Sequence, residues 1–491
     1  MSLAKKVAHN TLIQIFGKII STVLGLFAIA LITRYLGRSG FGEYTTVLTF
    51  LTFFAVTADF GLTLVTVQMI SGRDWPENKV LNNLFALRLV SSIACLILAP
   101  IIINFFPYSA AIKFGVFITF ISFLFPALNQ VIIGLFQKRL SMSRDTIAEA
   151  LSRLVLISGI ILTERWQAGL NGILLATVAS AFTSFIFHYF FSLKFAFIKL
   201  EFDWLVWKQI ISKAWPLAIT IVLNLIYLRA DTLLLSLFRN IEEVGLYGAT
   251  YRVLDVLTTI PFMFAGLILP ILTVAWLDKQ SAYFQKVLQK SFDVMAMIAI
   301  PLVVGAQFLS RPVMTFAAGR DFAESGRILQ VLIFAVAAIF LGTMFSHAVI
   351  ALDKQKTMIG FYVFASLSSL IAYLILIPRF SYFGAAAVTI YSETIIAIFS
   401  AYCVFKYSRF FPNFKVVFKS LLSGLAMGVF LYFLGNKYQD TLVRLFAVII
   451  SSSLIYGFSL YIFGGIKQSE LAVIFKRKTA SSEPSYGGPK L

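Results

Sequence analysis

Long apolar segments recur along the whole chain, and each has about the length of a membrane-crossing helix. A helix needs about 20 consecutive apolar residues to cross the hydrocarbon core of a bilayer. We predict fourteen such spans, separated by short connectors, and therefore an all-α polytopic membrane protein. The spans cover about 11–33, 44–70, 81–106, 112–136, 147–163, 172–193, 214–238, 245–276, 292–309, 328–351, 358–377, 384–405, 416–434 and 442–463.

The composition agrees with a membrane protein. Of the 491 residues, 59% are hydrophobic and only 13% are charged, which is too few polar residues to cover a soluble domain of this size. The two cysteines, Cys95 and Cys403, both fall inside apolar segments. We therefore expect no disulfide framework, no metal site and no cofactor. The first apolar run is too long for a cleaved signal peptide, so we expect it to be retained as the first span.

The distribution of basic residues predicts the orientation. The net charge is +19, but Lys and Arg lie mostly in the connectors, so the charge does not indicate a nucleic-acid partner. With the N-terminus inside, 25 of the 41 Lys and Arg residues fall in the termini and the even-numbered connectors, and 11 fall in the odd-numbered connectors. Cytoplasmic loops carry the excess of basic residues. We therefore expect a multi-pass protein of the cytoplasmic (inner) membrane with both termini in the cytoplasm.

Weak internal similarity predicts two repeats. The segment "FGEYTTVLTF" at 41–50 matches "VGLYGATYRV" at 244–253, an offset of 203 residues, and two weaker matches follow in the same order. Repeats of six spans each are typical of transporters that rock two halves around a central site. The predicted parts are an N-terminal lobe (1–199), an amphipathic interfacial helix (200–215), a C-terminal lobe (214–406), an extra pair of spans (416–463) and a cytoplasmic tail with a disordered end (464–491).

Polar residues inside the spans follow helical spacing. In the span 214–238, Asn224, Tyr227 and Asp231 share one helix face, and Tyr251 and Asp255 share a face of the span 245–276. A charge in hydrocarbon is costly, so these stripes predict a polar lumen. The cationic candidates are Lys18, Arg88, Arg229 and Arg252, and the polar or ion-coupling candidates are Asn224, Tyr227, Tyr251, Asp59, Asp231, Asp255 and Glu393.

A structural explanation of the same charges stays open. Arg252 and Asp255 at i, i+3, or Glu149 and Arg153 at i, i+4, can pair on one helix and stabilise it. Arg229, near the end of its span, can instead extend to the membrane interface. No such partner exists at helical spacing for Lys18, Arg88 and Asp59, which favours a role in the lumen.

Two segments resemble a known family. These are "ISTVLGLFAIALITRYLGRSGFGEYTTVLTFLTFFAVTADFGL" (20–62) and "RADTLLLSLFRNIEEVGLYGATYRVLDVLTTIP" (229–261). They are similar to the starts of the two halves of Wzx-type polysaccharide and O-antigen flippases. Those flippases belong to the multidrug/oligosaccharidyl-lipid/polysaccharide exporter superfamily. The resemblance extends over nearly the whole chain.

The resemblance implies a fold and a function. The fold would be two six-helix lobes around a V-shaped central cavity, with two further C-terminal helices, working by alternating access. The substrate would be an undecaprenyl-pyrophosphate-linked oligosaccharide repeat unit for surface polysaccharide, moved to the outer leaflet without enzymatic chemistry. By the same resemblance, the pyrophosphate would be held by Lys18, Arg88, Arg229 and Arg252. Partners would be the lipid bilayer, a polysaccharide polymerase and chain-length proteins.

Two other functions share this composition. A polytopic glycan polymerase or ligase would carry a long outside loop rich in Arg and His, whereas the chain's histidines, His9, His188 and His347, lie in no outside loop. An ion-coupled multidrug exporter of the same fold would depend on Asp59, Asp231 and Glu393 more than on the basic residues. The sequence does not reveal the sugar or the coupling ion.

Overall fold

The computed structural model describes residues 3–72, 74–434 and 441–465, and over these residues the fold is helical, without strands. Short 3-10 turns join some of the helices at Ile103–Phe105 (η1), Phe120–Phe123 (η2) and Arg320–Phe322 (η3). The α-helices are α1 (Leu3–Asp59), α2 (Leu62–Ser71), α3 (Glu77–Ile102), α4 (Ala110–Thr119), α5 (Leu124–Lys138), α6 (Ser143–Arg165), α7 (Gly169–Ser192), α8 (Trp204–Phe238), α9 (Ile241–Leu277), α10 (Ser281–Ala318), α11 (Ser325–Ala351), α12 (Gln355–Ser408), α13 (Lys415–Leu434) and α14 (Leu442–Ile462).

Twelve of the helical stretches in the described residues are long and apolar enough to cross a membrane. Two of them, α1 and α12, are too long for a single crossing. A straight 57-residue helix would be about 86 Å long, against a hydrocarbon core of about 30 Å. Each is interrupted at one residue, Gly37 with φ 64° and Ser381 with φ 54°. Counting the two parts of α1 and α12 separately raises twelve to fourteen, but the number of membrane crossings stays a prediction.

The interruption of α12 at Ser381 is stabilised by a side-chain hydrogen bond. A residue other than glycine at positive φ is strained by about 1–2 kcal/mol, because its Cβ crowds the backbone. The Ser381 hydroxyl donates a hydrogen bond to the Glu243 carboxylate at the start of α9, and Arg239 also pairs with Glu243 at 3.0 Å. The kink in α12 is thus fastened to the α8–α9 connection.

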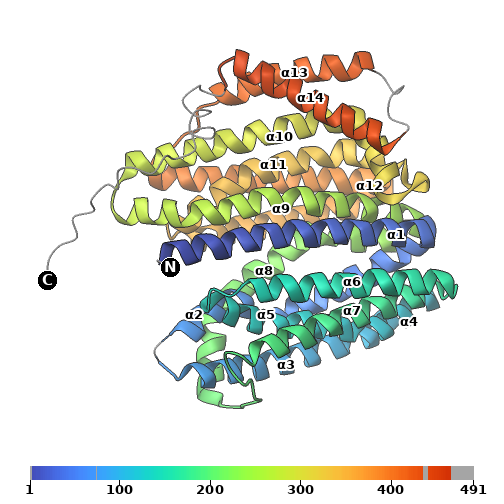
Figure 1. The fold of residues 1–491 in the computed structure, drawn as a ribbon, viewed down its shortest axis with the longest axis vertical. Coiled ribbons are helices and arrows are strands. Elements are labelled where there is room, and N and C mark those ends of the chain that lie inside the picture. The colour runs from blue at the N-terminus through green and yellow to red at the C-terminus, as the bar shows by residue number, and fades with distance from the viewer. Residues whose placement is uncertain (1–2, 73, 435–440, 466–491) are drawn as a thin grey trace.

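The helices form two halves with a peripheral pair (Figure 1). Helices α3 to α7 pack on one side of α1, and α8 to α12 form the other half, with α1 and α9 lying together where the halves meet. The last two helices, α13 and α14, pack against α10 at the outside of the second half (Figure 1). Their contact is apolar and includes Leu309, Met427, Leu431 and Leu445.

The repeat positions identified in the sequence face each other across this junction. A Cβ on Gly42 would lie 1.9 Å from the Ile241 carbonyl oxygen, and a Cβ on Gly245 would lie 2.1 Å from the Arg38 carbonyl oxygen. Gly42 and Gly245 differ by the offset of the repeat, 203 residues. Only glycine permits this approach of backbones, so the shared "G" of the two segments has a packing reason at the α1–α9 contact.

The segment between the halves is anchored to α3. The backbone N–H groups of Lys199 and Asp203 donate to Asn82 and Asn83 at 2.9 and 2.8 Å. A contact of 2.6 Å with the Lys79 ammonium lowers the pKa of Asp203. Most of the amphipathic stretch predicted at 200–215 is helical and forms the start of α8 (Trp204–Phe238). The position of this stretch at the membrane interface stays a prediction.

Candidate functional site

A cavity of about 690 Å³ lies between the two halves, within the size range of ligand-binding sites, about 300–1,000 Å³. Helices α1, α5, α6 and α7 line it from the first half, and α9 lines it from the second. Two cationic candidates face this cavity from opposite halves, Lys18 on α1 and Arg252 on α9. We call it the central cavity.

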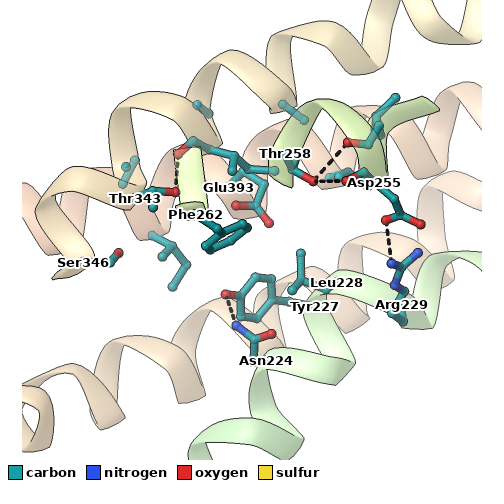
Figure 2. A pocket seen from close by; sticks show the side chains of 18 of the residues that line it. Asn224, Tyr227, Leu228, Arg229, Asp255, Thr258, Phe262, Thr343, Ser346 and Glu393 are labelled. Carbon is teal, nitrogen blue, oxygen red and sulfur yellow. Dashed lines mark hydrogen bonds and ion pairs between the residues drawn. The ribbon is translucent and has the colours of Figure 1, made fainter. Parts of the chain in front are cut away.

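A second cavity, of about 400 Å³, lies within the C-terminal half among α8, α9, α11 and α12. Its lining includes six of the predicted residues: Asn224, Tyr227, Arg229, Tyr251, Asp255 and Glu393. Asp255 lines both cavities. Figure 2 shows Arg229 reaching Asp255 at one end of this second cavity, away from Asn224. The two spaces therefore meet at Asp255.

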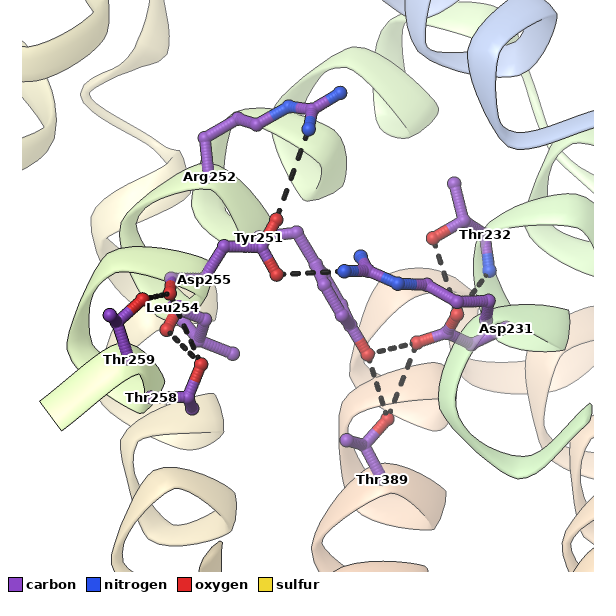
Figure 3. Close-up of polar contacts among 10 residues, drawn as sticks. Asp231, Thr232, Tyr251, Arg252, Leu254, Asp255, Thr258, Thr259 and Thr389 are labelled. Carbon is purple, nitrogen blue, oxygen red and sulfur yellow. Dashed lines mark hydrogen bonds and ion pairs between the residues drawn. The ribbon is translucent and has the colours of Figure 1, made fainter. Parts of the chain in front are cut away.

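Asp255 stands between two arginines, Arg252 (Figure 3) and Arg229. Arg229 on α8 lies 2.7 Å from Asp255 Oδ1, and Arg252 lies 3.8 Å from Asp255 Oδ2. The i, i+3 pair considered from the sequence thus exists, but the shorter contact comes from the neighbouring helix. Arg229 also lies over the Tyr251 ring, 5.2 Å from its centre, so its side chain is directed toward α9. Arg252 is left only loosely paired.

Asp231 does not face a lumen, which corrects the expectation drawn from its helical stripe. It is 0% exposed and lines neither cavity. Its carboxylate accepts a hydrogen bond from the Tyr247 hydroxyl at 2.7 Å. It also accepts hydrogen bonds from the Tyr251 hydroxyl and the Thr232 backbone N–H, and Figure 3 shows these two contacts. These donors satisfy the carboxylate inside the C-terminal half, which is why a charge can be buried there.

Arg88 and Asp59 pair with each other, although the sequence shows no partner for either at helical spacing. Arg88 Nη2 lies 2.5 Å from Asp59 Oδ1 and 2.7 Å from the Thr63 hydroxyl, and its Nε donates to the Ala127 carbonyl at 3.0 Å. The Arg88 side chain is 3% exposed, and neither residue lines a described cavity. The pair joins α1, α3 and α5 inside the N-terminal half, so we leave it out of the proposed substrate site.

Glu393 is the most isolated acid of the second cavity. It is 8% exposed, and its Oε1 has no hydrogen-bond partner. Figure 2 shows its carboxylate pointing into the cavity near Phe262. Close by, Asn224 Nδ2 donates to the Tyr227 hydroxyl at 2.6 Å. A buried acid without a donor is a place where a proton, a cation or a donor group of a ligand would bind.

The central cavity also contains polar residues that we did not single out from the sequence. Asn129 and Gln130 on α5, and Ser184 and His188 on α7, line its N-terminal side. Each interrupts an apolar segment, which is the signal that could have revealed them. The pair Glu149 and Arg153 on α6 also lines this cavity, at a separation of 3.8 Å. Within the described ranges, no cluster of three His, Cys, Asp or Glu residues could hold a metal ion.

Comparison with known sequences gives the family. The family described as "Polysaccharide biosynthesis protein" matches residues 7–276, more than half of the chain. The chain belongs to the polysaccharide biosynthesis protein family. This family member is 24% identical over 286 residues to the capsular polysaccharide biosynthesis protein CapF of Staphylococcus aureus, covering 58% of the chain and 72% of CapF. The resemblance to polysaccharide flippases stated from the sequence is thereby confirmed.

Solved structures confirm the fold of this family member. The lipid II flippase MurJ in an inward closed conformation matches 94% of the chain and 99% of MurJ, with a TM-score of 0.76 at 19% identity. An inward-facing multidrug resistance transporter of the MATE family matches 79% of the chain and 94% of that transporter, with a TM-score of 0.66 at 13% identity. The predicted fold, that of the multidrug/oligosaccharidyl-lipid/polysaccharide exporter superfamily, is therefore correct. The protein is thus a multi-pass membrane protein of a polysaccharide biosynthesis family, with the fold seen in MurJ and in MATE transporters.

Proposed function

We propose that this protein moves an oligosaccharide repeat unit, linked to undecaprenyl pyrophosphate, from the cytoplasmic to the outer leaflet of the inner membrane. The observation that carries the proposal is the central cavity, into which the two halves project the cations Lys18 and Arg252. A pyrophosphate needs several cationic donors, and a guanidinium can bind it with two parallel hydrogen bonds. The lipid tail stays in the bilayer, so the cavity can be polar.

Arg252 is better suited to a ligand than Arg229, because Arg229 makes the shorter contact with the carboxylate of Asp255 that both arginines share. The Arg252 side chain is 33% exposed, and its contact with Asp255 is long, at 3.8 Å. Arg229 lies 2.7 Å from Asp255. It therefore still neutralises this carboxylate when Arg252 binds a phosphate. Lys18 supplies a second positive charge from the other half of the molecule. Binding of one pyrophosphate between Lys18 and Arg252 would draw the halves together.

Alternating access is the mechanism we propose for the transfer. The halves contact each other at the end where the odd-numbered connectors lie, which we predict to be the outside. There Gly42 and Gly245 allow close backbone contact, Arg38 pairs with Glu324 at 3.2 Å, and Arg34 donates to the Phe316 carbonyl at 2.7 Å. These contacts support a state that is closed at that end. Rocking of the halves would break them and open the cavity to the outer leaflet, where a polymerase and chain-length proteins would take the product.

A binding measurement tests the proposed substrate. The purified protein in nanodiscs should bind undecaprenyl pyrophosphate carrying an oligosaccharide more tightly than undecaprenol, which lacks the phosphates. Arg252→Ala and Lys18→Ala should each lower this affinity. Lys286→Ala, which removes an exposed lysine of α10 outside both cavities, is the matched control and should leave it unchanged. Equal binding of undecaprenol and the pyrophosphate lipid by the unmodified protein would contradict the proposal.

A further inference from the structure

The N-terminal wall of the central cavity carries a hydrogen-bonded polar cluster that the proposed pyrophosphate site does not use. It consists of Asn129 on α5, Ser184 and His188 on α7, and Asp145 on α6. We propose that this wall, together with Ser21 on α1, is a glycan-binding subsite that accepts hydrogen bonds from the hydroxyl groups of the sugar next to the pyrophosphate. The inference rests on the proposed function. It adds that the sugar and the pyrophosphate of the substrate contact different residues of the central cavity.

Asn129 provides the first observation. Its side chain is 4% exposed, and its Nδ2 donates to the Ser184 hydroxyl at 3.1 Å. Its Oδ1 is buried without any hydrogen-bond partner, although the residue lines the cavity. A buried acceptor left unpaired is unfavourable for the free protein. A hydroxyl group of a ligand in the cavity would satisfy this oxygen, so the ligand gains the contact without displacing a protein partner.

The cluster behind Asn129 holds its amide in place. His188 is 2% exposed, and its ring nitrogens lie 2.8 Å from the Ser184 carbonyl and 3.0 Å from Asp145 Oδ1. The ring also stacks on Phe136, with 6.1 Å between ring centres. Since these contacts fix His188 and Ser184, the amide of Asn129 is oriented before the ligand arrives. Such preorganisation lowers the entropy cost of binding.

Ser21 brings a second unpaired oxygen into the same cavity from another helix. It is 3% exposed, its Oγ has no partner, and it lines the central cavity. Ser21 lies three residues after Lys18 on α1, which places both side chains on one helix face. A phosphate bound at Lys18 would therefore have the hydroxyl of Ser21 beside it, where the first sugar of the substrate follows the pyrophosphate.

The chemistry of the wall selects neutral donors over phosphate. The unpaired atom of Asn129 is a carbonyl oxygen, which repels a phosphate oxygen but accepts a hydrogen bond from a hydroxyl or an acetamido N–H. The carboxylates of Asp145 and Glu149 line the same side and also disfavour an anion, while Arg153, which lies on this side too, pairs with Glu149 at 3.8 Å. The phosphates of the substrate therefore bind to Lys18 and Arg252, and its sugar binds to the wall.

Two lipids and a matched pair of serines test the subsite. The protein in nanodiscs is titrated with undecaprenyl pyrophosphate carrying an N-acetylhexosamine and with undecaprenyl pyrophosphate without sugar. Ser21→Ala and Asn129→Leu should each weaken binding of the glycosylated lipid about three- to tenfold, with binding of the sugarless lipid unchanged. Ser180→Ala is the control, because Ser180 is also buried at the cavity but its hydroxyl already donates to the Ser152 carbonyl at 2.7 Å.

The outcomes separate the subsite from the proposed function. Ser21→Ala and Asn129→Leu proteins that bind both lipids as the unmodified protein does would overturn the glycan subsite, while a loss of both lipids in Arg252→Ala would still support the pyrophosphate site. An equal loss of both lipids in Ser21→Ala would also overturn the subsite, since a sugar contact cannot affect the sugarless lipid. Failure of the unmodified protein to bind either lipid would overturn the proposed function, and the subsite with it.

Discussion

Replacement of Arg252 with alanine is expected to slow transport without unfolding the protein. The reason is that Arg252 contributes little to stability but binds the substrate. Its ion pair with Asp255 spans 3.8 Å, and both side chains are about a third exposed. Pairs of this kind contribute about 0.2–1 kcal/mol to stability. Asp255 also keeps its 2.7 Å contact with Arg229, so the carboxylate is not left alone. The stability lost with Arg252 should therefore be below about 1 kcal/mol.

The expected effect on transport is larger. A charge-assisted hydrogen bond contributes about 1.5–3 kcal/mol, which corresponds to about a 10- to 150-fold slower rate if Arg252 binds the pyrophosphate. Arg252→Lys should restore only part of the rate, because an ammonium keeps the charge but lacks the bidentate geometry. Rates of lipid transfer in proteoliposomes, compared at equal amounts of folded protein, measure both variants.

A purely structural role for Arg252 predicts a different result. The alanine variant would then lose folded protein because it disturbs Asp255, and Arg252→Ala combined with Asp255→Asn would restore both expression and transport. Normal transport by that double variant would refute the phosphate contact. Arg229→Ala is the informative contrast, since it removes the shorter partner of Asp255 and should lower the yield of folded protein more than Arg252→Ala does.

Three further predictions concern other parts of the chain. A reporter fused after Lys478 should be cytoplasmic, and an outside location would overturn the orientation drawn from the basic connectors. Truncation before Val416 should leave folded halves, because α13 and α14 pack mainly against α10; a complete loss of folded protein would count against this. Glu393→Gln keeps the size but removes the carboxylate, so transport should lose any response to an imposed proton or sodium gradient, and an unchanged response would exclude Glu393 as the coupling group.

The sequence was sufficient to predict the membrane class and the family, because each depends on a pattern along the chain, while the division into two repeats stays a prediction. Apolar length indicates a span, and the shared glycine at Gly42 and Gly245 marks equivalent positions in two repeats. The boundaries were harder to predict. Where connectors were expected between two spans, α1 and α12 are each interrupted only at a kink, at Gly37 and Ser381, which have positive φ. The stretch predicted as an interfacial helix forms the start of α8, which continues to Phe238.

The candidate site was only partly predictable. Helical spacing identifies which polar residues share a face, but it does not show what lies opposite that face. Arg88 and Asp59 meet across helices, and Asp231 is enclosed by Tyr247 and Tyr251. Charged residues inside the spans were also considered before uncharged ones, so the polar cluster around Asn129 was missed. Partners from different helices become visible only once the tertiary structure brings them together.

Transfer of a defined lipid across a membrane tests the central claim most directly. Proteoliposomes containing the purified protein would be loaded on one side with undecaprenyl pyrophosphate carrying a fluorescent oligosaccharide, and arrival of the oligosaccharide at the other leaflet would be followed over time. We predict transfer that depends on the protein and falls at least tenfold in Arg252→Ala. No transfer above that of empty liposomes, together with uptake of lipophilic cations by the same vesicles, would contradict the proposed substrate and favour the multidrug exporter.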